Sequence, residues 1–241
     1  MVNFKPMHDH LMECTWKLIE KYGAKDPFLD IGGGSGSLSL FLANQGWQGA
    51  LVDSSRSAYA WAYCVLQGTP IRVILGDVST VGQKFSTVCL FDVIEHVKGD
   101  AALIRKAQDL LVPGGHIIIA VPMHQKEWRN DDDNYGHFRR YEPVQLRKLL
   151  EKAGFQVLEL RDHSFPFFWL MRRIYAPFIK KSKKAMEELT GKSHQNPLFT
   201  FFNKWLGSKA LWWLPNRFQD LFSHRYLGCH VVVIAKKGKG L

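Results

Sequence analysis

Short apolar runs alternate with amphipathic segments along most of this chain, and that alternation restricts the fold more than any other feature of the sequence. The apolar runs predict seven strands, at 28–31, 50–52, 72–75, 87–91, 117–121, 156–160 and 230–235. The segments between them carry apolar residues at helical spacing, as at 57–66 and in the segment that begins at Pro143. Because strands joined through helices form parallel crossovers, we expect an α/β fold with a mainly parallel sheet and helices on both of its faces.

Basic and aromatic side chains are concentrated in residues 164–227. The chain has 241 residues and a net charge of +10, and this segment holds 11 basic and 3 acidic side chains together with 15 of the 31 aromatic ones. It lies between the last two predicted strands, which a hairpin joins in the simplest version of such a fold. We therefore expect one domain formed by residues 1–163 and 228–241, with a helical insertion at 164–227 that serves as a binding-site lid or a membrane-contact element.

A glycine-rich segment with an acid on its upstream side joins the first predicted strand to the helix that follows. Asp30 precedes Gly32, Gly34 and Gly36, and a second acid, Asp53, ends the next strand. Glycine lets the backbone turn tightly and approach a ligand closely. A nicotinamide-dinucleotide loop would need glycine where Ser37 or Ser39 stands, and a carboxylate beside the loop favours a cationic group over a pyrophosphate.

With three further landmarks, this segment resembles a class I S-adenosylmethionine-dependent methyltransferase over about residues 25–160 and the final strand. The landmarks are Gly76-Asp77-Val78, the segment Phe91 to Val97, and Leu111 to Gly115. The resemblance implies a Rossmann-like fold and S-adenosylmethionine as the cofactor. It implies that the cofactor is held by Asp30, Gly32, Gly34, Gly36, Asp53, Ser54, Asp77, Val78 and Asp92. Asp53 has a second interpretation as a helix cap, and Asp77 as a turn residue.

His96 and His137 are the candidate catalytic residues. His96 follows the fourth predicted strand and so lies at the ligand edge of the sheet, and an unperturbed histidine pKa near 6.5 suits a general base. The alternative is that Glu95 and His96 only cap or pack the helix that begins there.

A metal site is a further interpretation of the same segment. On a helix, Asp92, Glu95 and His96 would share one face, and the D/E-x-x-E-H pattern resembles the metal site of quinone-precursor O-methyltransferases and small-RNA 2′-O-methyltransferases. His124 or His137 would complete the ligand set. Since three ligands on one turn are incomplete, we expect no metal.

The segment Tyr135 to Tyr141 resembles the G-H-x-R-x-Y/F segment that covers the active site of many related methyltransferases. We expect Tyr135, Arg139 and Arg140 to bind substrate, together with Trp169 of the insertion. The alternative is that the two arginines pair with the acidic run 131–133 and only fix the loop.

These features predict transfer of a methyl group from S-adenosylmethionine to a hydrophobic or lipid-linked small molecule, with oxygen as the favoured atom. The alternatives are an RNA methyltransferase and a catalytically silent, cofactor-binding regulatory module. The insertion predicts peripheral contact with an anionic membrane and, less strongly, with nucleic acid. Four separated cysteines, no apolar leader and no apolar stretch of about 18 residues predict a cytoplasmic protein, at most bound to the inner face of a membrane. The sequence leaves the oligomeric state open.

Overall fold

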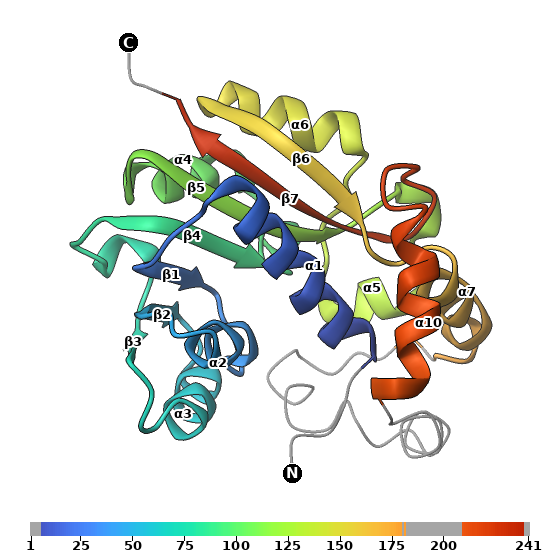
Figure 1. Ribbon diagram of the computed structural model, residues 1–241, viewed down its shortest axis with the longest axis horizontal. Helices are drawn as coiled ribbons and strands as arrows, with labels where there is room; N and C mark the ends of the chain where they lie inside the picture. The colour runs from blue at the N-terminus through green and yellow to red at the C-terminus, as the bar shows by residue number, and fades with distance from the viewer. Residues whose placement is uncertain (1–5, 180, 182–208, 239–241) are drawn as a thin grey trace.

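One seven-stranded sheet organises the computed structural model, which describes residues 6–179, 181 and 209–238 (Figure 1). The strands are β1 (Phe28–Ile31), β2 (Gly49–Asp53), β3 (Ile71–Leu75), β4 (Phe85–Phe91), β5 (Leu111–Pro122), β6 (Phe155–Asp162) and β7 (His230–Lys237). Their order is β3-β2-β1-β4-β5-β7-β6; β7 runs antiparallel to both neighbours, and all other pairs are parallel. The expected α/β, Rossmann-like, mainly parallel sheet is thereby confirmed.

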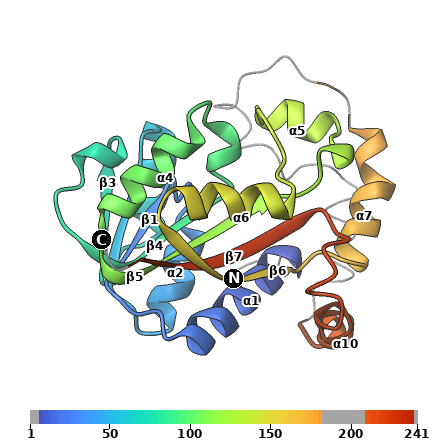
Figure 2. The same cartoon turned by 90° about the horizontal axis from the view of Figure 1, so that it is seen from above.

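Helices cover both faces of the sheet (Figure 2). α1 (Pro6–Tyr22), α2 (Ser37–Asn44) and α3 (Arg56–Val65) pack on one face, and α4 (Asp100–Asp109) and α6 (Pro143–Lys152) on the other. β5 serves both cores, since Ile117 and Ile119 face α4 and α6 while Ile118 faces α1 and α2. Side chains that alternate between the faces of a strand explain why this strand is an unbroken apolar run.

The described part of the insertion is helical. It contains α7 (Phe167–Tyr175), the 3₁₀ turn η4 (Ala176–Phe178) and α10 (Lys209–Asp220), which lie between β6 and β7 in the sequence. Residues 182–208, among them Trp205, lie outside the described residues, and the division into a domain and an insertion stays a prediction. No helix of the described ranges combines the length and the apolar character that crossing a bilayer demands.

Two local features of the fold break the regular pattern of strands and helices. Pro113 to Gly115 lie inside β5 at an irregularity where the pairing with β4 shifts between Phe85 and Thr87. Gly114 has φ 73°, which suits this irregular backbone. The segment after β4 forms only a 3₁₀ turn, η2 (Ile94–His96), so Asp92 does not share a helical face with Glu95 and His96.

Gly49 provides a test of the sheet packing. Gly49 of β2 lies opposite Phe28 of β1 in the parallel strand pair. A Cβ atom at position 49 would overlap the carbonyl oxygen of Phe28. We expect Gly49→Ala to lower the free energy of unfolding by more than about 2 kcal/mol. Gly82→Ala, where no atom lies within 4 Å of the added Cβ, should change it by less than about 0.5 kcal/mol. Urea unfolding measures both, and equal midpoints would contradict this account of β1–β2 packing.

Candidate functional site

A hollow of about 340 Å³ lies where β1, β2 and β3 end, which is the ligand edge of an open parallel sheet. Five of the residues predicted to hold the cofactor line it: Gly32, Asp53, Ser54, Asp77 and Val78. Val93, Val97 and Leu103 supply apolar wall, and Lys106 is the one cation among the lining residues. We call this space the glycine-loop hollow.

The loop between β1 and α2 needs glycine for its conformation. Gly32 has φ 66° and Gly34 has φ 54°, both in the left-handed region that L side chains rarely adopt. A Cβ on Gly32 would lie 2.9 Å from a methyl group of Val93, whereas a Cβ on Gly34 would meet no atom within 4 Å. The loop therefore turns tightly at Gly32 and leaves open space at Gly34, where a ligand can approach the backbone.

Asp53 connects the glycine loop to the next crossover. One carboxylate oxygen accepts a hydrogen bond from Gly34 N at 3.0 Å, and the other accepts one from Ser55 N at 2.8 Å. Ser55, and not Asp53, is the N-cap residue of α3, because its Oγ accepts from Ala58 N. Asp53 thus lines the hollow with a carboxylate whose position is fixed by backbone donors.

Asp30 lies beneath the loop and is almost fully buried. Its Oδ2 accepts a hydrogen bond from Ser39 Oγ at 2.8 Å, while its buried Oδ1 has no hydrogen-bond partner among the described residues. Burial raises the pKa of this carboxyl to about 7, although the hydrogen bond from Ser39 acts in the opposite direction. A buried acid with an unpartnered oxygen is a feature that a nearby cation would stabilise.

Asp77 is a turn residue that also lines the hollow. Its side chain accepts a hydrogen bond from Ser79 N at 2.9 Å and so caps the turn η1 (Val78–Thr80), yet it is 62% exposed and lines the hollow. Lys106 Nζ lies 3.4 Å away. The hydrogen bond from Ser79, with a smaller contribution from Lys106, lowers the pKa of Asp77.

The donor set fits S-adenosylmethionine. Two carboxylates, Asp53 and Asp77, face the hollow with acceptor oxygens suited to hydroxyl and amine donors, and the buried acid Asp30 lies beside them. A carboxylate-lined hollow suits a positively charged molecule without phosphate. These residues could therefore hold the ribose and the cationic methionine part of that cofactor.

Asp92 differs from its expected place. It follows β4 with φ 53°, does not line the hollow, and its Oδ1 lies 2.6 Å from Nε2 of His230 at the start of β7. Desolvation would raise the pKa of Asp92, but the charge and hydrogen bond of His230 lower it overall. His230 in turn lies 2.9 Å from His163 Nε2. The carboxylate of Asp92 thus contacts the start of β7, and its role in holding the cofactor stays a prediction.

His137 lies close to Glu95 and His96, although it is far from them in the sequence. One ligand atom of each lies within 4.8 Å of the others, so the three could hold a divalent ion. Glu95 is fully buried with both oxygens unpartnered among the described residues, and burial followed by the charge of Asp92 raises its pKa well above the usual value. His124 is excluded from this group because it contacts Glu142 and the carbonyl of Tyr226. The expectation of a metal-free site stays a prediction.

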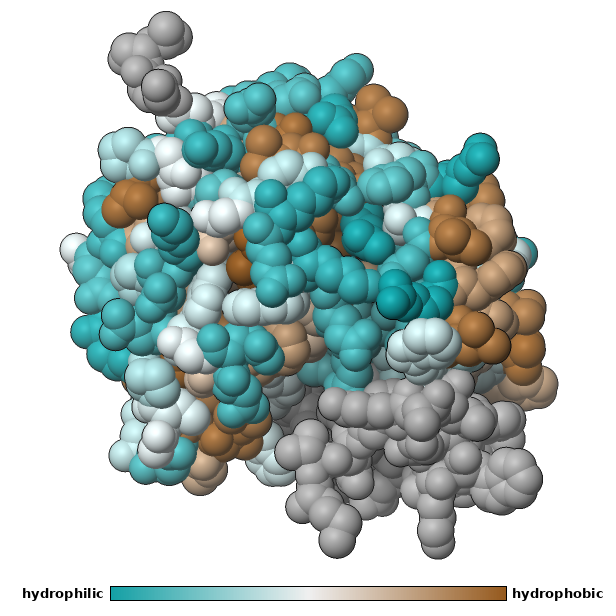
Figure 3. Space-filling model, in the orientation of Figure 1, coloured by the Kyte–Doolittle hydropathy of each residue, from teal (hydrophilic) through white to brown (hydrophobic). Residues whose placement is uncertain are grey.

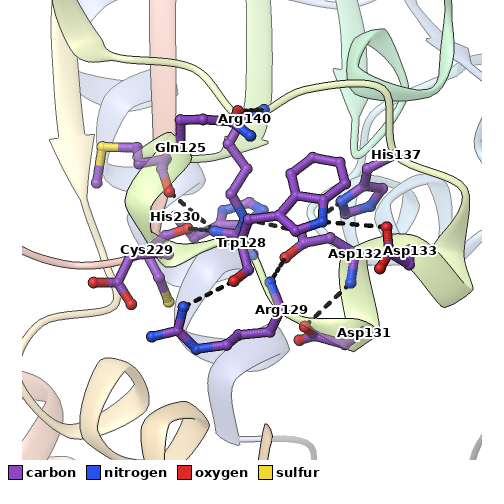
Figure 4. Close-up of polar contacts among 12 residues, drawn as sticks. Gln125, Trp128, Arg129, Asp131, Asp132, Asp133, His137, Arg140, Cys229 and His230 are labelled. Carbon is purple, nitrogen blue, oxygen red and sulfur yellow. Dashed lines mark hydrogen bonds and ion pairs between the residues drawn. The ribbon is translucent and has the colours of Figure 1, made fainter. Parts of the chain in front are cut away.

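The two candidate catalytic histidines are neighbours. The ring centroids of His96 and His137 lie 4.6 Å apart in an edge-to-face arrangement. His137 Nδ1 lies 2.8 Å from Asp132 Oδ1 of α5 (Asn130–Tyr135), and Figure 4 shows this pair beside Trp128. Burial, followed by the charge of His137, lowers the pKa of His96. The structure thus places an acid-supported imidazole next to a neutral one.

Arg140 does not have the substrate-binding role expected for it. Its guanidinium is buried and donates to Asp132 Oδ1 at 2.8 Å and to the carbonyls of Met123 and Cys229 (Figure 4). This is the alternative in which the arginine fixes the loop. Arg139 pairs with Asp100 at 2.6 Å, and both arginines line a second hollow of about 430 Å³ beside α6.

The binding of substrate by Tyr135 and Trp169 stays a prediction. The ring of Tyr135, 46% exposed, stacks on His137 with centroids 6.0 Å apart. Trp169 of α7 packs under the guanidinium of Arg173, which lies 4.2 Å from the centre of its ring, and its indole donates to Glu127 at 3.5 Å.

Sequence reasoning missed two residues of this site. The acidic run predicts Asp132 only as a partner for arginines, although its position five residues before His137 is a usable signal. His230 opens a strand 138 residues after Asp92, and no local pattern in the sequence indicates that pairing.

The comparisons with known proteins agree with this geometry. Residues 10–160 match a family model described as a methyltransferase domain. The chain is 25% identical over 139 residues to the ubiquinone biosynthesis O-methyltransferase of Yersinia enterocolitica serotype O:8, which covers 52% of this chain and 55% of that protein. It is 28% identical over 125 residues to the protein of the same name from Pseudomonas aeruginosa strain LESB58, over 48% and 53% of the two chains. The chain thus spans about half the length of the curated relatives it matches.

A solved structure shares the fold over nearly the whole chain. The magnesium protoporphyrin IX methyltransferase of Synechocystis PCC 6803 with bound S-adenosylmethionine gives a TM-score of 0.55 at 15% identity, over 96% of this chain and 80% of that one. At that identity the likeness shows the fold alone.

Asp30 gives a pH-dependent test of the site. Between about pH 4 and pH 7 the folded chain keeps a proton on Asp30 that the unfolded chain has lost, so this group lowers stability as the pH rises. We expect Asp30→Asn, measured without cofactor, to stabilise the chain by roughly 2–3 kcal/mol more at pH 8 than at pH 5. Denaturant unfolding at both pH values measures the gain. Asp109→Asn, on an exposed residue at the end of α4, should show no such pH dependence; a gain for Asp30→Asn that is equal at both pH values would contradict the raised pKa.

Proposed function

The chain belongs to the family of S-adenosylmethionine-dependent methyltransferase domains, and we propose that it methylates an oxygen atom of a hydrophobic small molecule, either a quinone-like phenol or a lipid-linked acceptor. The observation that carries this proposal is the Asp132–His137 pair, which lies among aromatic rings. The segment that holds His137 is joined to the turn after β4, because Phe138 N donates to the carbonyl of Glu95 at 2.8 Å. Methylation at oxygen is supported by the relatives named ubiquinone biosynthesis O-methyltransferases.

The residues of the glycine-loop hollow are assigned to the cofactor. Asp53 binds the ribose hydroxyls, Asp77 accepts from the adenine amine, and the backbone at Gly34 lies against the methionine part. The cofactor supplies a methyl group on a positively charged sulfur. The protein must then exclude water and align the acceptor oxygen with that methyl group.

His137 is assigned as the general base. A carboxylate accepts but does not donate, so the contact with Asp132 places the proton of the neutral ring on Nδ1 and leaves the lone pair on Nε2. Nε2 takes the proton of the acceptor hydroxyl as the new bond to oxygen forms, and Asp132 stabilises the imidazolium that results. His96 stays neutral beside it, because burial and the charge of His137 both lower its pKa.

The surroundings of His137 favour an aromatic or otherwise apolar acceptor. Trp128 meets the imidazole edge-on with ring centroids 6.5 Å apart, and Tyr135 stacks on it with centroids 6.0 Å apart. Phe138, the next residue, is 51% exposed. Flat apolar walls around a single base suit a phenol better than a charged, strongly hydrated substrate.

Cofactor binding is tested at Asp53. We expect Asp53→Asn to weaken the binding of S-adenosylmethionine by about 10- to 100-fold, because charge-assisted hydrogen bonds contribute ~1.5–3 kcal/mol each. Isothermal titration calorimetry measures the dissociation constant. Glu20→Gln, on the exposed face of α1, is the matched control and should leave the affinity unchanged. Equal affinity for wild type and Asp53→Asn would remove Asp53 from the cofactor site.

Catalysis is tested at His137. With tritiated S-adenosylmethionine and a prenylated catechol as the probe acceptor, we expect His137→Gln to lower kcat by about 10²- to 10⁴-fold while cofactor affinity stays the same. His224→Gln, on a side chain that is 62% exposed and distant in sequence, should keep wild-type activity. The label should be recovered as an aryl ether; label recovered on nitrogen, or none transferred by a wild type that binds the cofactor, would contradict O-methylation.

Removal of metal ions distinguishes two roles for His137, that of a general base and that of a metal ligand. If His137 is the base, dialysis against EDTA should leave kcat unchanged. Loss of activity in EDTA that Mg²⁺ or Zn²⁺ restores would instead make Glu95, His96 and His137 a metal site and would overturn the assignment of His137 as general base.

A further inference from the structure

The outer side of α7 and η4 carries an apolar stripe that faces solvent. Leu170, Ile174 and Phe178, at positions i, i+4 and i+8, are 50%, 62% and 81% exposed. The residues on the opposite side, Phe168 and Arg172, are buried against the protein. A helix that buries an arginine and exposes its leucine, isoleucine and phenylalanine is reversed relative to an ordinary surface helix.

α10 exposes a second stripe of the same kind. Trp213 is 61% exposed, Leu214 68%, Phe218 46% and, directly after the helix, Leu221 75%. The opposite side of α10 holds Gln219, which is fully buried. Both helices of the described insertion thus turn large apolar side chains away from the domain.

The two stripes adjoin. Phe167 of α7 packs on Phe218 of α10 with ring centroids 5.9 Å apart, and Phe168 stacks on Trp212 at 5.2 Å. Gln219 Oε1 also accepts hydrogen bonds from the backbone of Phe167 and Phe168 at 3.1 and 3.3 Å. In Figure 3 apolar residues gather along the right-hand edge of the molecule, where Figure 1 places α7 beside α10. We call the combined surface the α7–α10 face; its members are Leu170, Ile174, Phe178, Trp213, Leu214, Phe218 and Leu221.

The charged side chains around this face are mostly cations. Arg217 is exposed with its guanidinium 5.6 Å from the ring centre of Trp213, and Arg225 is exposed just beyond α10. Arg173 lies beside Ile174, over the ring of Trp169, and also pairs with Glu127. Among the described residues of 164–227 the one acid is Asp220, and it is paired with both Lys17 and Arg161.

We propose that the α7–α10 face docks on the surface of an anionic phospholipid bilayer. Aromatic and aliphatic side chains on a helix lying in the interface enter the boundary between headgroups and acyl chains, while arginines beside them meet lipid phosphates. The cations beside this face complement the negative charge of an anionic lipid surface. A second copy of this chain would instead bring its own cations against them, so the charges favour the lipid surface. The proposal goes beyond the methyl transfer proposed above, and it would bring the chain to acceptors that dissolve in lipid.

Vesicle binding tests this proposal without cofactor or acceptor, so its failure is distinct from a failure of the proposed activity. Wild-type chain should co-sediment with phosphatidylcholine vesicles that contain phosphatidylglycerol and should bind pure phosphatidylcholine vesicles at least about tenfold more weakly. Raising the salt concentration should weaken binding to the anionic vesicles. Equal binding to both vesicle types, or binding to neither, would overturn the proposal.

A matched pair of variants locates the contact. Ile174 and Val144 are both β-branched, both on helices and both 62% exposed, but Val144 belongs to α6. We expect Ile174→Asp to lower partition into anionic vesicles by about tenfold or more and Val144→Asp to leave it unchanged, with thermal unfolding and S-adenosylmethionine affinity unaltered in both. Two results would overturn the proposal: equal losses in both variants, or concentration-dependent self-association that Ile174→Asp abolishes while vesicle binding persists. The second would assign the face to contact between copies of this chain.

Discussion

The buried carboxylate of Asp132 holds together the parts of the molecule that face the proposed acceptor. It accepts hydrogen bonds from Arg129 N, His137 Nδ1, Arg140 Nε and Arg172 Nη2, all between 2.8 and 2.9 Å. Burial would raise its pKa, but the hydrogen bonds from His137, Arg140 and Arg129 hold that pKa far below the usual range. Leaving a buried charge without its partners costs several kcal/mol, about 3–5 in measured cases, so the four contacts stabilise one another.

Through these contacts Asp132 links three segments that are distant in the sequence. Arg140 carries the link to β5 and β7 through the carbonyls of Met123 and Cys229, and Arg172 carries it to α7. The proposed base, the loop that covers it and the helix that bears the outward apolar stripe are thus fixed to the same acid. The helix proposed to dock on a lipid surface, α7, is therefore the same helix whose Arg172 contacts Asp132, the acid that is hydrogen-bonded to His137.

The residues assigned to the cofactor lie closer together in the sequence than the residues assigned to the acceptor. Asp30, the glycine loop and Asp53 lie within 24 consecutive residues, and parallel crossovers bring the ends of β1, β2 and β3 to one edge of the sheet. The alternation of apolar runs predicted this edge, and the spacing of acid and glycine predicted what lies on it. Arg140, Asp92 and the bulged Pro113–Gly115 segment could not be placed in this way. An arginine in this segment could face a ligand or pair with Asp132. Which of the two occurs depends on where another helix packs, and the spacing of residues along the chain does not determine that packing.

The sequence by itself determined the sheet, the glycine loop, the carboxylates at its edge and the two candidate histidines, because each follows from short-range pattern and from the geometry of parallel strands. The tertiary structure decided which acid supports which histidine, pairing His137 with Asp132 and His230 with Asp92. It also decided that the apolar side chains of α7 and α10 point outward, since the buried sides of those helices are occupied by Arg172 and Gln219 with partners from other segments. Helical periodicity shows that a stripe exists, but only the packing of the neighbours determines which side of the helix faces the solvent.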